Sequence, residues 1–86
     1  MSKTYTHICK RTCSRSVTIT FNENNIIEDV KFLGGCHGNT QGVAKLCIGR
    51  SLQEIHDILR GIDCNGRGTS CPNELALGIE EILNSL

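Results

Sequence analysis

Residues 16–33 read SVTITFNENNIIEDVKFL, and this stretch decides the fold of the 86-residue chain. Its first part alternates apolar and polar residues, which places Val17, Ile19 and Phe21 on one face of a strand. The polar run at 22–25 then supplies residues that tolerate positive φ and bond their own backbone, as a tight turn requires. The first half of the stretch therefore predicts a strand that ends in a turn.

The second half, residues 26–33, reads as the return strand of a hairpin. Its period of two places Ile26, Val30 and Phe32 on one face. A weaker candidate strand covers residues 4–9. Together these segments predict a three-stranded antiparallel sheet in the first third of the chain.

Three helices are expected after the sheet, because the apolar period changes beyond residue 34. The first covers residues 40–48 and ends at Gly49. The second begins at a capping box, in which Ser51 bonds the amide of Glu54 and the Glu54 side chain reaches back, and it stops near Gly61.

The third helix begins near Pro72, which suits the first helical position. The residues expected on the apolar stripes are Val43, Leu46 and Cys47 in the first helix, Leu52, Ile55, Ile58 and Leu59 in the second, and Leu75, Ala76, Ile79, Ile82, Leu83 and Leu86 in the third. The sequence thus predicts one α+β domain over residues 1–86, in which three helices pack on one face of the sheet.

Composition limits the function classes. Only 38% of the residues are hydrophobic, so the core is small, and cores of this size typically supply only about 3–5 kcal/mol of net stability. Nine basic residues balance nine acidic ones, and three aromatic residues offer little base stacking, which argues against a nucleic-acid partner. Lys10, Arg11 and Arg15 read as a solvated strand end.

The chain has no apolar run long enough for a membrane span and no apolar leader near its start, which favours a reducing cytoplasm. In that compartment cysteine clusters more often bind metal or carry out redox chemistry than form structural disulfides. Six cysteines are present. They are the chain's main chemical resource.

Four of the cysteines lie at the ends of expected elements, namely Cys13, Cys36, Cys64 and Cys71. An antiparallel hairpin would bring Cys13 and Cys36 to the same end of the sheet. Four thiolates suit structural zinc or an iron–sulfur cluster. Two other interpretations stay open, a redox or disulfide pair and inert buried thiols, since no Cys-x-x-Cys pair is present.

The remaining candidates are weaker. Cys47 lies on an apolar stripe and reads as a core residue, Cys9 reads as edge packing, and His56 reads as solvated. His37 follows Cys36 directly and could replace a thiolate or relay protons. The glycines near residue 34 lack the Lys that completes a phosphate loop, and no orienting third group accompanies Cys71 and His37. We expect no catalysis by the chain itself.

Three stretches resemble the TSCPD domain family: GGCHGN at 34–39, GIDC at 61–64 and TSCPNELA at 69–76. The similarity covers nearly the whole chain. It departs at Asn73, where the motif that names the family has Asp. Such domains occur as small stand-alone bacterial proteins and at the C-terminus of adenosylcobalamin-dependent ribonucleotide reductases.

This resemblance implies metal binding through Cys13, Cys36, Cys64 and Cys71. It also implies that the partner could be a ribonucleotide reductase, a ribonucleoside-diphosphate reductase included, or another redox protein. In that case the chain would be an accessory domain for redox transfer or docking in deoxyribonucleotide synthesis.

From about Cys13 onward the chain is also distantly similar to the U-type iron–sulfur assembly scaffolds, which implies their fold and a possible scaffold role. Cys13, Cys36 and Cys71 match the scaffold thiolates. Arg15 stands where those proteins carry an Asp that keeps their cluster labile, and Ser70 replaces their His. Cys64 adds a fourth thiolate, so a closed site that holds a metal fits better than cluster donation.

Overall fold

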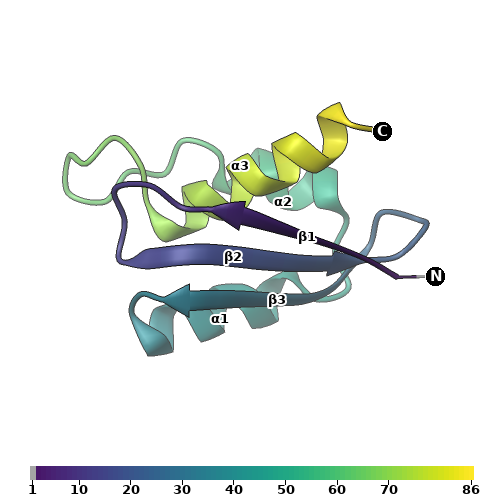
Figure 1. Ribbon diagram of the computed structural model, residues 1–86, viewed down its shortest axis with the longest axis horizontal. Helices are drawn as coiled ribbons and strands as arrows, with labels where there is room; N and C mark the ends of the chain where they lie inside the picture. Colours follow the sequence, from purple (N-terminus) through teal and green to yellow (C-terminus); the bar gives the residue numbers. More distant parts are fainter. Residues whose placement is uncertain (1) are drawn as a thin grey trace.

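The computed structural model describes residues 2–86 and has three antiparallel strands followed by three helices (Figure 1). The elements are β1 (Lys3–Ile8), β2 (Ser14–Phe21), β3 (Ile27–Gly34), α1 (His37–Cys47), α2 (Leu52–Leu59) and α3 (Cys71–Asn84). The strands form one sheet in the order β1-β2-β3, antiparallel throughout. This confirms the predicted α+β arrangement.

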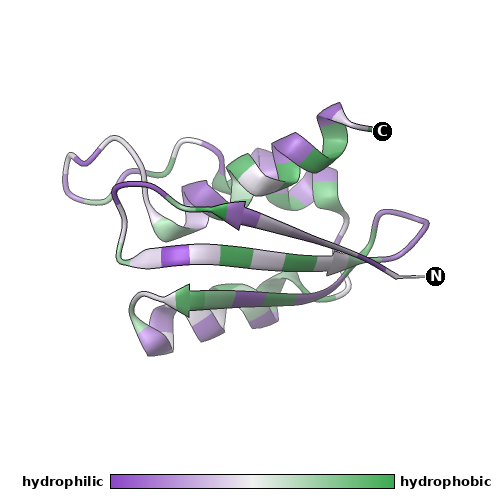
Figure 2. Ribbon diagram, in the orientation of Figure 1, coloured by the Kyte–Doolittle hydropathy of each residue, from purple (hydrophilic) through white to green (hydrophobic). Residues whose placement is uncertain are grey.

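The central strand and the last helix form most of the core. Val17 and Ile19 of β2 are fully buried, as are Leu75 and Ile79 of α3. Figure 2 shows the matching alternation of hydrophobic and polar residues along β2. The helix approaches closely at Gly78, where a Cβ atom would lie 2.9 Å from the Cβ of His7 in β1. Glycine therefore lets α3 lie against the sheet.

The predicted core face of the return strand is wrong at its start. Thr20 pairs with Asp29, whereas Phe21 pairs with Ile27, so the ladder skips one residue of β3. A bulge of this kind reverses which side chain faces inward. Ile27 is accordingly 1% exposed, and Ile26 instead forms an isolated bridge with Ser51.

The helix boundaries largely follow the expected signals, with two corrections. Ser51 caps α2 by accepting from the Glu54 amide at 3.1 Å, but the Glu54 carboxylate pairs with Arg50 rather than reaching back. The first helix begins at His37, earlier than predicted, so the glycine and polar residues expected in a loop form its first turn. Pro72 is the second residue of α3.

Some residues predicted on apolar stripes face solvent. Leu46 is 70% exposed and Ile58 is 59% exposed, while Leu86 lies beyond the end of α3 and is also exposed. The helical period was correct, but each of the two short helices contacts the rest of the molecule over a narrow face. Within residues 2–86, no helix combines the length and the apolar character that crossing a membrane requires.

Candidate metal centre

The predicted cysteines lie on segments that meet at one end of the molecule. Cys13 directly precedes β2, Cys36 directly precedes α1, Cys64 lies in the connection between α2 and α3, and Cys71 is the first residue of α3. Figure 1 shows the β1–β2 connection, the end of β3 and the α2–α3 connection together at the left. The expected placement of Cys13 and Cys36 at the same end of the sheet is therefore present in the fold, and the α2–α3 connection lies at that end as well.

Cys71 is the centre of this end. The hydroxyl of buried Ser14 donates to the sulfur of Cys71 at 2.9 Å. The backbone of Gly35 also lies against Ser14, because a Cβ atom on Gly35 would come within 2.5 Å of the Ser14 hydroxyl. Ser14 follows Cys13 and Gly35 precedes Cys36, so one small side chain connects the surroundings of three cysteines.

Arg67 reaches the same cysteines from the α2–α3 connection. Its Nη1 donates to the sulfur of Cys13 at 3.9 Å. That hydrogen bond and the negative charge of the Cys13 thiolate raise the pKa of Arg67, and the more distant charges of Cys64 and Cys71 act in the same direction. The guanidinium therefore lies within electrostatic range of three of the four predicted ligands.

Hydrogen bonds to its backbone amides hold the turn that carries Arg67. The Asp63 carboxylate accepts the amides of Gly66 and Gly68, each at 2.5 Å. The Arg67 amide donates to the Cys64 carbonyl at 3.2 Å, and the Cys64 amide donates to the Thr69 carbonyl at 3.0 Å. These bonds fix the backbone on both sides of Cys64.

The TSCPN stretch at 69–73 seats Cys71 at the helix start. Ser70 accepts from the Asn73 amide at 3.1 Å as the N-cap of α3, and its hydroxyl donates to the Ile62 carbonyl at 2.6 Å. Asn73 accepts from the Gly61 amide at 2.6 Å and donates to the Thr69 hydroxyl at 2.8 Å. The side chains of Ser70 and Asn73 thus bond backbone groups and Thr69, and the thiol of Cys71 is bonded by Ser14 instead.

Glu74 is a buried carboxylate that the sequence analysis did not single out. It is 3% exposed and accepts from Thr69 at 2.5 Å and from the Lys10 amide at 3.1 Å, and it is hydrogen-bonded to His7 at 3.1 Å. Burial alone would raise the pKa of Glu74, but the hydrogen bonds together outweigh it and lower the pKa. This carboxylate joins β1, the β1–β2 connection and the start of α3.

The two cysteines outside the predicted ligand set are protected by packing. Burial raises the pKa of Cys9 to about 12, helped by the charges of Glu74 and Cys71. Burial likewise raises the pKa of Cys47 to about 11. Cys47 is 1% exposed, which confirms its predicted core role, and Cys9 packs against the core from its edge. Both keep their protons at neutral pH.

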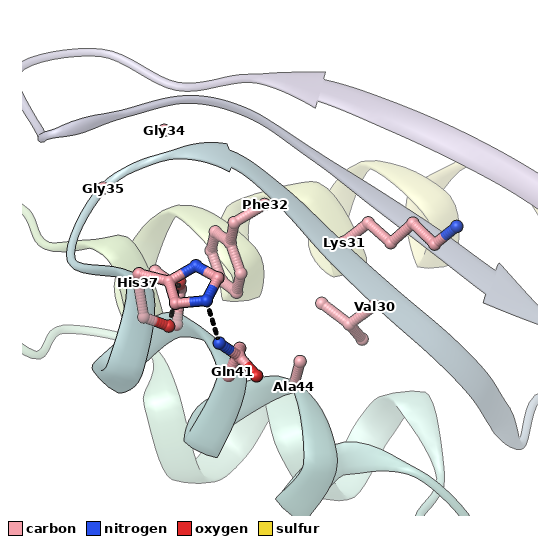
Figure 3. Close-up of a pocket in the computed structure, with 9 residues that line it drawn as sticks. Val30, Lys31, Phe32, Gly34, Gly35, His37, Gln41 and Ala44 are labelled. Atoms are coloured by element: carbon pink, nitrogen blue, oxygen red, sulfur yellow. Dashed lines mark hydrogen bonds between the residues drawn. The ribbon is translucent and has the colours of Figure 1, made fainter.

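His37, Ser70 and Arg15 are the three possible auxiliary residues of the predicted site, and the structure gives each of them contacts of its own. His37 lines a groove of about 350 Å³ between β3 and α1, where its ring lies beside Phe32 and is hydrogen-bonded to Gln41 (Figure 3). Ser70 is the cap of α3. Arg15 is exposed, and its carbonyl accepts from the Cys9 amide at 2.9 Å.

The prediction that His56 is solvated is wrong, because His56 bonds both Asp57 and Glu80 and is partly buried.

The donor chemistry fits a thiophilic metal, but the placement is open. Cys13, Cys36 and Cys64 are exposed thiols, and Cys71 is partly buried at the same end of the molecule. Among residues 2–86, no three His, Cys, Asp or Glu side chains are grouped closely enough to hold a metal ion. The four-thiolate ligand set therefore stays a prediction, supported in kind by its soft donors and in location by the shared end.

Three residues of this end escaped the sequence analysis: Ser14, Arg67 and Glu74. The position of Glu74 one turn into a helix that begins with a cap was an available signal, since a first-turn carboxylate is favoured there. The contact between Arg67 and Cys13 joins residues 54 positions apart and left no local pattern.

Comparisons with known proteins give one positive finding. The family model described as the TSCPD domain matches residues 1–83. No curated protein and no solved structure matches the chain. A match over nearly the full length, together with the seating of Cys71 by the stretch that carries the family's motif, leads to one conclusion: this chain belongs to the TSCPD domain family.

Proposed function

We propose that this chain is a non-catalytic domain that holds one metal centre, zinc or an iron–sulfur cluster, through Cys13, Cys36, Cys64 and Cys71. The observation that carries the proposal is the convergence of three exposed, thiol-bearing connections on the start of α3. Thiolates are soft ligands that select zinc and iron–sulfur clusters over magnesium and calcium.

The contacts around Cys71 support a ligand with a fixed position, whose three partners carry exposed sulfurs. Ser14, Ser70 and Asn73 hold the start of α3 with buried hydrogen bonds, so the sulfur of Cys71 has a defined place. The other three sulfurs are exposed, so a metal can draw them inward without opening the packed core. In such a site the free energy of metal binding is also free energy of folding.

The small apolar core leaves the cysteine end of the molecule for a metal to stabilise. The buried apolar cluster centres on β2 and α3, while the cysteine end is joined to it mainly through polar contacts. A metal that links the β1–β2 connection, the start of α1 and the α2–α3 connection to α3 would therefore fasten the least apolar part of the molecule.

The test is elemental analysis with an ultraviolet–visible spectrum on protein purified anaerobically without a metal-binding tag. We expect about one zinc per chain with no visible absorbance, or iron and sulfide with visible absorbance. Cys71→Ser should lose the metal. The matched control is Cys47→Ala, because an 11-residue helix separates Cys47 from Cys36, about 16 Å of chain, and its content should equal that of the wild type.

Wild-type protein without metal, or equal metal in the Cys71→Ser and Cys47→Ala variants, would refute the proposal. Detection of iron and sulfide would favour a role in electron transfer or cluster assembly over a purely structural one. A role beside a ribonucleotide reductase stays a prediction, since no contact in the fold identifies a partner.

A further inference from the structure

We infer that Arg67 is a positioning residue of the cysteine centre, which donates a hydrogen bond to the sulfur of Cys13 and supplies the positive charge that gathered thiolates need. The inference rests on the proposed metal function and adds to it a residue outside the ligand set. It concerns how the site is assembled and how tightly it holds its metal.

The contact pattern of Arg67 carries the inference. Its Nη1 lies 3.9 Å from the sulfur of Cys13. Within residues 2–86, no other cationic side chain donates to a cysteine sulfur, although Lys10 and Arg11 lie on the neighbouring β1–β2 connection and Arg15 lies at the start of β2. Arg67 thus differs from the other basic residues of this end in having a specific thiol partner.

The backbone turn that carries Arg67 uses residues suited to positive φ. Asn65, Gly66 and Gly68 all have positive φ, at 53°, 80° and 83°. The Asp63 carboxylate stabilises the turn by accepting two of its amides. The turn directs residue 67 back toward the β1–β2 connection.

Charge gives the physical reason for an arginine. Four thiolates around a divalent zinc leave a net charge of about −2 on the ligand set, and holding these anions together costs free energy. A guanidinium in contact with one sulfur and near two others offsets part of that repulsion. Groups that hydrogen-bond to metal ligands commonly change metal affinity by about 10- to 100-fold when removed.

The experiment compares three variants by competition with a chromophoric zinc chelator at low ionic strength. Arg67→Gln removes the charge, Arg67→Lys keeps it, and Arg60→Gln is the matched control. Arg60 follows α2, pairs with Glu80 at 3.6 Å, and its substitution changes the net charge by the same amount. We expect Arg67→Gln to weaken zinc binding about tenfold, Arg67→Lys to recover most of the loss, and Arg60→Gln to stay within about twofold of the wild type.

A second readout separates electrostatics from structure. Raising the ionic strength from about 0.01 M to about 1 M shortens the screening distance from about 30 Å to about 3 Å, so the difference between wild type and Arg67→Gln should shrink. The melting temperatures of both proteins in chelator should agree, because Arg67 lies outside the core.

The outcomes distinguish the two proposals. A wild-type chain that binds no zinc and no iron overturns the proposed function and this inference with it. A wild type that binds metal, with Arg67→Gln equal to Arg60→Gln in affinity, overturns only the role of Arg67. A lower melting temperature of Arg67→Gln in chelator, with no recovery of affinity in Arg67→Lys, also overturns it.

Discussion

The body of the molecule and its cysteine end are stabilised by different forces. In the body, apolar residues of β2 and α3 such as Ile19 and Leu75 are fully buried against each other. At the cysteine end, side-chain oxygens satisfy backbone amides and the thiols of Cys13, Cys36 and Cys64 are exposed. The comparison indicates that the body holds the fold and that the cysteine end presents chemistry on a polar framework.

The boundary between the two regions is the start of α3. Thr69, Asn73 and Glu74 form a buried, hydrogen-bonded polar group there, in contrast to the exposed turn that precedes it. Buried polar groups are costly unless every partner is present, and within residues 2–86 no buried side-chain nitrogen or oxygen lacks one. This group transmits the rigidity of the body to Cys71.

The largest expected effect breaks the body. Leu75→Ala should lower the free energy of unfolding by about 3 kcal/mol, because it leaves a cavity beside fully buried neighbours. Cys64→Ser should change it by less than about 0.5 kcal/mol in the presence of chelator and reductant, since Cys64 is exposed. Urea unfolding of both variants in the same buffer measures the contrast. Equal losses would show that the cysteine end contributes to the fold without metal.

The next largest effect is expected at the start of α3, the boundary between the two regions. Glu74→Gln should cost about 2 kcal/mol at pH 7, because the carboxylate that bonds Thr69, His7 and the Lys10 amide becomes a neutral amide. The pKa of Glu74 lies below its ordinary value of 4.5. The wild type therefore has this stabilisation above about pH 4.5 and loses it as the pH falls through the lowered pKa.

The pH profile is the check on Glu74. Urea unfolding between pH 6 and pH 3 should show the wild type converging on Glu74→Gln at the acid end. A constant gap between wild type and Glu74→Gln across the whole range would contradict the assigned ionisation.

The sequence predicted the body of the molecule better than it predicted the cysteine end. The alternation at 16–21, the cap at Ser51 and the stripe of the last helix are local patterns, and all three appear in the structure. The error at Ile26 arose from a bulge, which depends on how two strands pair and not on either strand alone. Periodicity also could not reveal that Leu46 and Ile58 would be exposed.

The candidate site was predicted in outline only. The positions of the four cysteines at element ends followed from the elements around them, and the antiparallel hairpin predicted that Cys13 and Cys36 share one end of the sheet. The partners of those cysteines did not, since Ser14 meets Cys71 across 57 positions and Arg67 meets Cys13 across 54. Long-range side-chain pairs leave no period in a single sequence.

An effect of similar size tests the packing around Ser14. Gly35→Ala should cost about 2 kcal/mol, because φ is +85° and the new Cβ would lie 2.5 Å from the Ser14 hydroxyl that bonds Cys71. Gly49→Ala is the matched control, since Gly49 has the same φ of +85° with no atom near the new Cβ, and it should cost about 1 kcal/mol. Thermal unfolding in chelator gives both values. Equal costs would mean that the Ser14 side chain moves aside without a measurable cost in free energy.

The smallest effect concerns a polar contact within the body. His56 of α2 bonds Asp57 and reaches Glu80 of α3 at 3.0 Å, and these two hydrogen bonds raise the pKa of His56 above its ordinary value of 6.5. A raised pKa gives stabilisation that is complete below about pH 6.5 and is lost as the pH rises through the folded-state pKa. His56→Gln should therefore cost about 0.5–1 kcal/mol at pH 5.5 and less at pH 8.

Urea unfolding at the two pH values measures the difference between wild type and His56→Gln, with His37→Gln as a control that leaves the α2–α3 contact intact. The lowered pKa values of Asp57 and Glu80 keep both carboxylates charged across this range, so His56 alone titrates within the contact. A gap that widens toward pH 8 would contradict the assigned sign. A gap that closes would mean that even in the apolar body one helix contact depends on charge, although far less than the start of α3 depends on Glu74.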